Sequence, residues 1–346
     1  MSALTSNYEF AYPTFFPESI FNLITEARVG DPKIIQKSAQ RRKKREKLTV
    51  DGKLAILACD HPGRFVTKNG NEPIRMGNRH EYLSRILRVV TSPKFDGVMS
   101  TTDILEDLLI IDQLVLERGG ESFLDGKVLV GCMNRGGLSG SSYEMDDRFT
   151  SFTAASIHRL RLDAAKFMFR LDLKDSTSLD TIVSCANAIT ELNALSIPSF
   201  LETFSVQKTP EGGYKTLKTA DEMIKVVGVA SALCDSSQGI WLKIPYCDGF
   251  ERVAKATTCP ILMLGGESVG DPTGIFKEFT KGMVAGKTVR GALVGRNILY
   301  PGNEDPSAVA DAVSGIVHQN FTVQDALQHL VAARGQGMPN LTKHFV

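Results

Sequence analysis

Short apolar runs alternate along this chain with longer stretches in which apolar residues recur every three or four positions. The apolar runs cover residues 54–59, 97–100, 128–133, 164–171, 199–204, 240–245, 261–264 and 292–294. Runs of this length without polar alternation are typical of parallel strands that are covered on both faces. The stretches between them predict amphipathic helices. These cover residues 103–117, 179–195, 220–233, 248–257, 272–284 and 306–318.

Eight repeats of strand and helix predict an α/β fold, a (β/α)8 TIM barrel, over residues 51–320. The alternative is an open doubly wound sheet, which usually carries a glycine-rich nucleotide turn after its first strand. The segment DHPGR at residues 60–64 is not such a turn. We therefore expect a barrel with an N-terminal helical extension at residues 1–50 and a C-terminal helix and tail at residues 321–346.

Composition and charge narrow the function classes. The 346 residues are 42% hydrophobic, as in ordinary globular proteins, and the net charge of +1 creates no field that would attract nucleic acid or an anionic membrane. The basic run RRKKR at residues 41–45 falls in a stretch of helical character, 32–47, and we interpret it as a solvated helix face rather than a nucleic-acid patch. No apolar run reaches membrane-spanning length. With no signal-peptide pattern and six scattered cysteines, we expect a reduced, cytoplasmic protein.

Two lysines interrupt the apolar runs, Lys166 in the fourth predicted strand and Lys243 in the sixth. A buried ammonium group must be paired, lose its proton or take part in chemistry. Strand alternation turns both lysines into the barrel, together with Met168 and Arg170, and alternate strands share interior layers. A neighbouring cation and poor solvation lower a lysine's pKa, and a neutral amine attacks carbonyls to form a Schiff base. Lys243 is the expected nucleophile, and a structural ion pair with Asp60 or Glu202 is the alternative.

Further polar residues fall at the predicted C-terminal ends of the strands, where TIM barrels carry their chemistry. Asp60 and Glu202 are candidate acid/base groups, or counter-ions of the two lysines. Lys166 either assists the reaction or only positions a hydroxyl or a carboxylate. Of the histidines, His61 alone lies at a strand end, as a candidate substrate contact. Because a catalytic zinc needs three protein ligands, we predict a mechanism without metal.

The last two predicted strands end in glycines. Gly265, Gly266 and Gly295 let backbone N–H groups approach an anion, and Arg296 adds a guanidinium. Barrels often bind phosphate at this place, so we predict a phosphate site. Two tight turns with a surface arginine are the alternative.

The order of these features resembles the class I, Schiff-base aldolases of the deoxyribose-phosphate, archaeal-type fructose-bisphosphate and tagatose-bisphosphate aldolase group. The resemblance covers about residues 50–317 and rests on short segments at the strands: ACDH at 58–61, DAAK at 163–166, FLE at 200–202, LKIP at 242–245, GG at 265–266 and GRN at 295–297. It implies that Lys243 forms the Schiff base, that Asp60 lies beside substrate hydroxyls, and that Gly266 and Arg296 bind phosphate. It implies no cofactor.

The fourth strand departs from the family pattern. Family members often have a tyrosine near its end as a proton donor, and this chain has Arg170 nearby, which suits a substrate carboxylate or second phosphate. The chain looks still more like barrel proteins associated with inositol catabolism. That likeness implies cleavage of 2-deoxy-5-keto-gluconate 6-phosphate to dihydroxyacetone phosphate and malonate semialdehyde. The alternatives are a Schiff-base transferase of thiolase-like or transaldolase type, and a non-catalytic phosphosugar-binding barrel. Aldolases of this group often assemble, so a homo-oligomer is expected.

Overall fold

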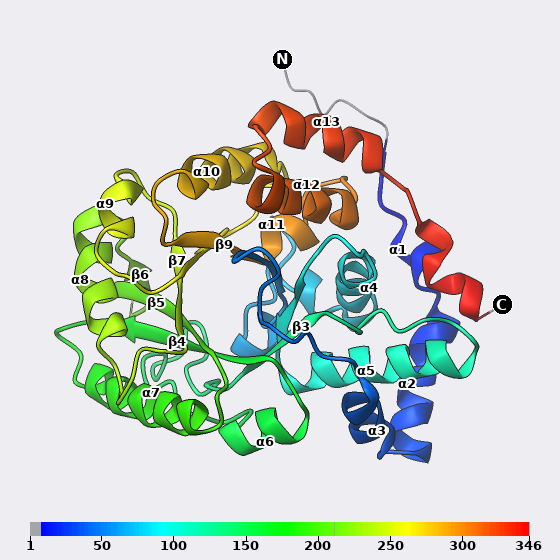
Figure 1. Cartoon of the computed structure of the whole chain (residues 1–346), viewed down its shortest axis with the longest axis horizontal. Helices are drawn as coiled ribbons and strands as arrows, with labels where there is room; N and C mark the ends of the chain where they lie inside the picture. The colour runs from blue at the N-terminus through cyan, green and yellow to red at the C-terminus, as the bar shows by residue number, and fades with distance from the viewer. Residues whose placement is uncertain (1–7, 211, 346) are drawn as a thin grey trace.

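Eight parallel strands form a closed barrel in the computed structural model, which describes residues 8–210 and 212–345 (Figure 1). The barrel strands are β1 (Leu54–Ala58), β2 (Gly97–Ser100), β3 (Val128–Cys132), β4 (Ala164–Leu171), β5 (Ser199–Lys208), β7 (Ile240–Pro245), β8 (Ile261–Leu264) and β9 (Val289–Val294). Pairing of β1 with β9 and of β4 with β5 closes the ring. The TIM barrel expected from the sequence is confirmed.

A ring of helices covers the outside of the barrel (Figure 1). These are α4 (Arg79–Val90), α5 (Thr102–Glu117), α6 (Ala154–Arg159), α7 (Thr177–Ala194), α8 (Ala220–Ser231), α9 (Phe250–Ala254), α10 (Thr273–Met283) and α12 (Pro306–Gln319), with the short α11 (Arg296–Leu299) directly after β9. The helix predicted at 248–257 is reduced to the single turn of α9. Asp305 caps α12 by accepting the backbone N–H of Ser307 at 3.0 Å.

Side chains alternate between two apolar layers. One set of alternate strand residues packs inside the barrel: Leu54, Ile56, Met99, Val128, Val130, Phe200, Leu262 and Leu293. The other set packs against the helices and includes Leu242 and Ile244, the two neighbours of Lys243. This alternation turns Lys243 toward the barrel axis, as expected from the sequence.

The segments outside the barrel pack on two sides of it. The helices α1 (Tyr12–Phe15), α2 (Glu18–Gly30) and α3 (Ile34–Arg41) lie outside α4 and α5 (Figure 1). At the other end of the chain, α13 (Val323–Ala333) packs on α10 and α12. Within the described part of the chain, no helix is both long and apolar enough to cross a membrane.

The basic run at residues 41–45 attaches the N-terminal segment to the barrel. The helix ends at Arg41, and Arg42 is buried against Asp163, with Nη2–Oδ2 at 2.9 Å. Arg45 reaches Asp96 at 2.8 Å. The interpretation as a solvated helix face is therefore wrong for Arg42 and Arg45. These two arginines are buried or half-buried because they face carboxylates of the barrel, Asp163 and Asp96. Helical periodicity in residues 32–47 could not reveal those partners.

His318, near the end of α12, joins two segments at the N-terminal end of the barrel. Its Nδ1 lies 2.9 Å from Asp51 Oδ2, and its Nε2 lies 2.9 Å from Asp96 Oδ2. Burial would lower the pKa of His318, but the two carboxylates outweigh it and raise that pKa above its ordinary value. The contact between α12 and the segment before β1 therefore depends on pH.

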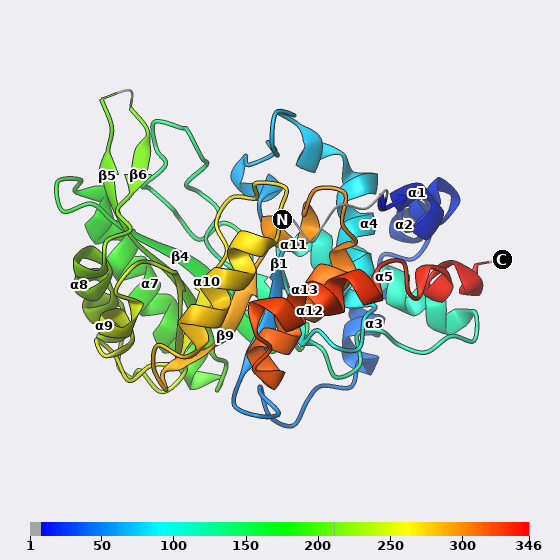
Figure 2. The ribbon, with the colours of Figure 1, turned by 90° about the horizontal axis from the view of Figure 1, so that it is seen from above.

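A hairpin that the sequence did not predict rises from the opposite end of the barrel. The outer part of β5 leaves the ring and pairs antiparallel with β6 (Tyr214–Thr216), so that the hairpin stands beyond the C-terminal ends of the strands (Figure 2). The long connection between β3 and α6, residues 133–153, lies at the same end. Together these segments make the walls of the site described next.

Candidate active site

A cavity of about 330 Å³ opens at the C-terminal ends of the strands. Its lining gathers eight of the residues proposed from the sequence: Asp60, His61, Glu202, Lys243, Gly265, Gly266, Gly295 and Arg296. Lys166 does not line the cavity; its side chain is 1% exposed and contacts Asp60 and Glu202 beneath the opening. The barrel thus brings most of the proposed site to one place.

Five charged side chains alternate in sign at the floor of this cavity, and we call them the charged row. Lys243 Nζ lies 2.6 Å from Glu202 Oε1, and the other oxygen of Glu202 contacts Lys166 Nζ. Lys166 Nζ lies 3.0 Å from Asp60 Oδ2, which in turn lies 3.1 Å from Arg135 Nη1. All five residues are buried. Each carboxylate of the row therefore lies between two cations and is paired within the row.

The two lysines of the charged row differ in their protonation. Burial lowers the pKa of Lys243, Glu202 opposes that effect, and the neighbouring ammonium of Lys166 adds to it, so that the net pKa lies below the ordinary value. Burial also lowers the pKa of Lys166, but its two carboxylate partners outweigh burial and raise it. Lys243 is therefore the amine that loses its proton more easily, and Lys166 stays an ammonium group.

The carboxylates of the row are held in their charged form. Burial would raise the pKa of Asp60, yet Lys166 and Arg135 hold it well below its usual range. Burial acts in the same direction on Glu202, and Lys166 and Lys243 hold its pKa below the ordinary value. Burial lowers the pKa of His61, so its ring is neutral near pH 7. The ring Nδ1 of His61 has no hydrogen-bond partner among the described residues.

The turns after β8 and β9 form one side of the cavity. Asn297 Nδ2 donates to the backbone oxygen of Gly265 at 2.6 Å and so joins the two turns. A side chain at Gly295 would place Cβ only 2.5 Å from the backbone oxygen of Ala58, so glycine is required there. Arg296 is half-buried, and its nearest carboxylate is the exposed Glu267, at 3.7 Å. Among the residues that the structure describes, the guanidinium of Arg296 therefore faces the cavity with one weak carboxylate partner.

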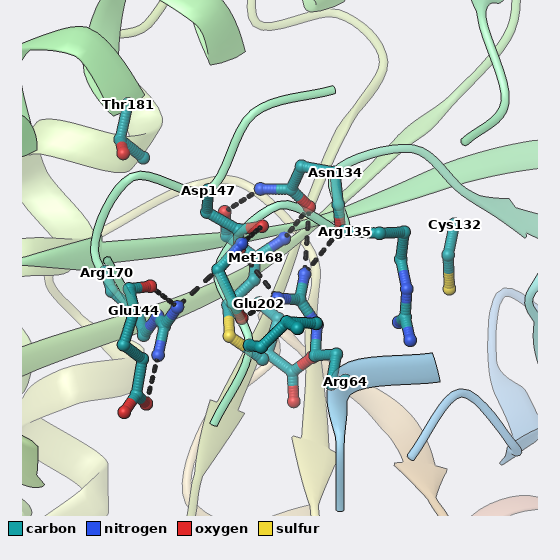
Figure 3. Close-up of polar contacts among 12 residues, drawn as sticks. Arg64, Cys132, Asn134, Arg135, Glu144, Asp147, Met168, Arg170, Thr181 and Glu202 are labelled. Carbon is teal, nitrogen blue, oxygen red and sulfur yellow. Dashed lines mark hydrogen bonds and ion pairs between the residues drawn. The ribbon is translucent and has the colours of Figure 1, made fainter. Parts of the chain in front are cut away.

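Arg170 occupies a different place from the one expected. It does not line the cavity, and its guanidinium pairs with Glu144 Oε1 at 2.6 Å and with the backbone oxygen of Glu144 (Figure 3). The connection between β3 and α6 folds over the end of β4 and uses Arg170 to fix that loop. Met168, two residues earlier on the same strand, lines the cavity instead. A direct contact of Arg170 with substrate is not supported by this geometry.

Two arginines of the site had no role assigned from the sequence. Arg64, only 6% exposed, lines the cavity and bonds Asp147 Oδ2 at 2.8 Å and the backbone oxygen of Asn134 at 2.6 Å (Figure 3). Arg135 ends the charged row. Neither residue lies in a periodic pattern, and the position of Arg135 at a strand end is the one signal that pointed to it. No group of three or more His, Cys, Asp or Glu side chains in residues 8–210 and 212–345 is arranged to hold a metal ion.

Comparison with known proteins places this barrel among aldolase-like structures. The fructose-bisphosphate aldolase from Slackia heliotrinireducens shares 11% identity over 97% of this chain and 96% of its own, with a TM-score of 0.60. An archaeal fructose-1,6-bisphosphate aldolase, solved with its catalytic Lys bound to the carbinolamine intermediate, shares 18% identity over 82% of this chain and 99% of its own, with a TM-score of 0.54. At these identities the likeness concerns the fold.

A nearer relative is Cgl0159 from Corynebacterium glutamicum. The two chains are 36% identical over 88% of this chain and 98% of that one, and their structures agree with a TM-score of 0.81. The model of the Cgl0159-like family matches residues 52–314, which span the barrel. The chain therefore belongs to the Cgl0159-like family.

Proposed function

We propose that this protein is a class I aldolase, a lyase that cleaves a phosphorylated ketose or keto sugar acid through a Schiff base on Lys243. The observation that carries the proposal is the difference between the two buried lysines. Lys243 faces a cavity, has Glu202 as its one carboxylate partner among the described residues and has a lowered pKa, whereas Lys166 lies below the cavity between two carboxylates. A lysine is activated for Schiff-base formation by desolvation or by a neighbouring cation, and both act on Lys243.

The contacts of Lys243 suggest how the first steps proceed. Lys243 passes a proton to Glu202, 2.6 Å away, and the neutral amine adds to the substrate ketone. Protonated Glu202 then returns the proton to the carbinolamine oxygen, which leaves as water and gives the protonated imine. Glu202 thus acts as the proton donor. In the class I aldolases that this chain resembles, a tyrosine near the end of the fourth strand often has that role, and β4 has no tyrosine there.

Bond cleavage needs a base on the other side of the substrate. Asp60 is ionised and lines the cavity, so it accepts the proton of the hydroxyl group that becomes the aldehyde. The carbon–carbon bond breaks, and its electrons pass into the imine, leaving an enamine on Lys243. Protonation of the enamine and hydrolysis of the imine then release the second product.

Phosphate is the proposed anchor of the substrate. Arg296 and the glycine turns after β8 and β9 lie along one side of the cavity, where binding a remote phosphate orients the reacting carbons. As a specific substrate we propose 2-deoxy-5-keto-gluconate 6-phosphate, which would yield dihydroxyacetone phosphate and malonate semialdehyde. Its carboxylate would meet Lys218, an exposed lysine that follows β6 and lines the cavity.

Borohydride trapping tests the proposal. Reduction in the presence of dihydroxyacetone phosphate should add one covalent adduct, located by peptide mass at Lys243. Lys243→Met should abolish the adduct, while Lys166→Met should keep it at Lys243 with a changed rate. Lys255→Met, at an exposed position, is the matched control and should be labelled like the wild type. Equal labelling of Lys243→Met and wild type would contradict the assignment.

A substrate panel then separates the reaction types. Fructose 1,6-bisphosphate, tagatose 1,6-bisphosphate and 2-deoxy-5-keto-gluconate 6-phosphate are incubated with enzyme, with and without an acceptor aldehyde. Free dihydroxyacetone phosphate without acceptor indicates a lyase. Product that forms only with acceptor indicates a transaldolase-type transferase and contradicts the lyase assignment.

A further inference from the structure

Arg135 holds Asp60 in two ways at the buried end of the charged row. Its Nη1 lies 3.1 Å from Asp60 Oδ2, and its Nη2 donates to the backbone oxygen of Asp60 at 2.8 Å. A planar guanidinium can make both contacts at once, which a lysine cannot do with one nitrogen. Arg135 is 7% exposed and does not line the cavity, so it acts on the site through Asp60 and not through the substrate.

The backbone around Arg135 fixes the guanidinium in this place. The N–H groups of Arg135 and Gly136 both donate to the backbone oxygen of Arg148 at 3.1 Å. The amide of Asn134 bonds the backbone of Met168 twice, at 2.7 and 2.8 Å, and so ties the end of β3 to β4 (Figure 3). The position of Arg135 is therefore set by two strands and by the loop that returns over it.

The guanidinium of Arg135 occupies space that is open because residue 63 is a glycine and has no side chain. A Cβ atom at position 63 would lie 2.2 Å from Arg135 Nη2 and 2.9 Å from Thr101 Cγ2. A substitution there would displace the guanidinium without removing its charge. The backbone angle φ of Gly63 is not positive, so alanine causes no backbone strain at this residue.

Counting charges shows what Arg135 adds to the row. With Arg135 the row has three cations and two carboxylates, so one positive charge is in excess. An arginine in a protein keeps its proton, and Lys166 lies between both carboxylates. The excess is relieved when a proton leaves the row for solvent, and Lys243, which has Glu202 as its one carboxylate partner among the described residues, is the group that gives it up. Without Arg135 the two lysines and two carboxylates would balance, and Lys243 would keep its proton.

Other charged or titratable groups line the same cavity and leave this count unchanged. They are His61, Arg64, Lys218, Glu267 and Arg296. His61 is neutral, Arg64 is paired with Asp147, and Arg296 lies 3.7 Å from the exposed Glu267 and is not part of the charged row. Lys218 is exposed, where solvent screens its charge.

We propose that Arg135 is a positioning residue that sets the pH range in which Lys243 is the nucleophile: it occupies Asp60 as a third cation of the charged row, and Lys243 is then the amine that releases its proton. Arg135 has this role only if Lys243 forms the Schiff base of the proposed function. Its removal should therefore change the pH at which Lys243 reacts and not the lysine that reacts.

The test measures the rate of cyanoborohydride trapping with dihydroxyacetone phosphate between pH 5.5 and 9.5. Arg135→Gln should move the midpoint of the rate profile upward by about one pH unit, which makes labelling about tenfold slower below the midpoint. Arg135→Lys keeps the cation and should restore most of the wild-type midpoint. Gly63→Ala should give a smaller upward shift. Arg148→Gln changes an exposed arginine of the same loop and should leave the midpoint unchanged.

Each outcome separates the two proposals. If wild type is not labelled at any pH, the proposed function fails. If wild type is labelled at Lys243 and Arg135→Gln keeps the wild-type midpoint, the role of Arg135 is refuted while the Schiff base stands. If Arg135→Gln does not fold, Gly63→Ala decides the role of Arg135. An unshifted midpoint of its pH–rate profile refutes that role, because a purely structural effect changes the amount of folded protein and not the midpoint.

Discussion

Replacing Arg42 by methionine should destabilise the whole barrel. The Arg42 side chain is fully buried where the N-terminal segment meets the barrel. It bonds Asp163 Oδ2 at 2.9 Å and the backbone oxygens of Lys127 at 2.9 Å and Arg161 at 2.5 Å. Methionine retains the apolar stem but none of these bonds. Arg42→Met therefore leaves a buried carboxylate and two carbonyls without this partner.

The size of the effect follows from what remains around Asp163. Breaking a buried ion pair by removing one partner costs about 3–5 kcal/mol. Asp163 keeps the N–H of Leu129 at 2.9 Å and Lys44 Nζ at 3.5 Å, which places the loss near the lower limit, about 3 kcal/mol. With a urea dependence of about 3 kcal/mol per molar for a protein of this size, the unfolding midpoint should fall by about 1 M.

Urea unfolding followed by circular dichroism measures this loss. The matched control is Lys43→Met, the adjacent residue of the same basic run, whose side chain is 86% exposed and lies 3.8 Å from Asp125. Exposed ion pairs of this kind contribute little to the free energy of unfolding, so the control should have the same urea midpoint as the wild type. Equal midpoints for Arg42→Met and Lys43→Met would refute the view that this run is a buried attachment.

Three further substitutions test other parts of the structure. Glu202→Gln removes the carboxylate shared by two lysines, and cleavage in the panel assay should fall about 10²–10⁴-fold, with the control that circular dichroism spectra stay unchanged. His318 has a raised pKa, so its ion pairs stabilise fully below about pH 6.5 and are lost as pH rises through the raised value. The melting temperature of His318→Gln should therefore lie furthest below wild type near pH 6 and approach it toward pH 9; a constant difference would contradict this. Gly291 has φ +132°, and a Cβ there would lie 1.9 Å from the backbone oxygen of Leu54, so Gly291→Ala should cost about 3 kcal/mol or more in urea unfolding. Gly274→Ala, in α10 with no atom within 4 Å, is its control and should unfold no earlier than wild type.

Periodicity predicted the barrel well because strands covered on both faces leave a continuous apolar signal. It also placed Lys243 and Lys166 inside, since the side-chain period of a strand is two and each lysine lies among apolar neighbours. The polar residues at the strand ends then followed, because parallel strands in a barrel end at one face. Contacts within the strand layer were thus predictable from position alone.

Contacts made by loops were not predictable in this way. The role expected for Arg170 assumed an open strand end, but the loop of residues 133–153, which has no periodicity, folds over it and supplies Glu144. The two contacts of Arg135 with Asp60 depend on the same loop. The β5–β6 hairpin was missed because its outer part is polar and half-exposed, so that no apolar run marks it. Long polar side chains at loop positions take partners that only the folded backbone defines.

Closure of the barrel has a consequence for folding during synthesis, because the barrel closes only when β9 has left the ribosome. The first strand pairs with the last, Leu54 beside Gly291, so one edge of β1 has no partner until the whole ring has been synthesised. At about 5–20 residues per second, the ~240 residues between those strands take on the order of 10–50 s to leave a ribosome. During that interval the edge of an apolar strand is available for wrong pairing. The arrival of β9 therefore removes a pairing edge that β1 has presented for most of the synthesis of the chain.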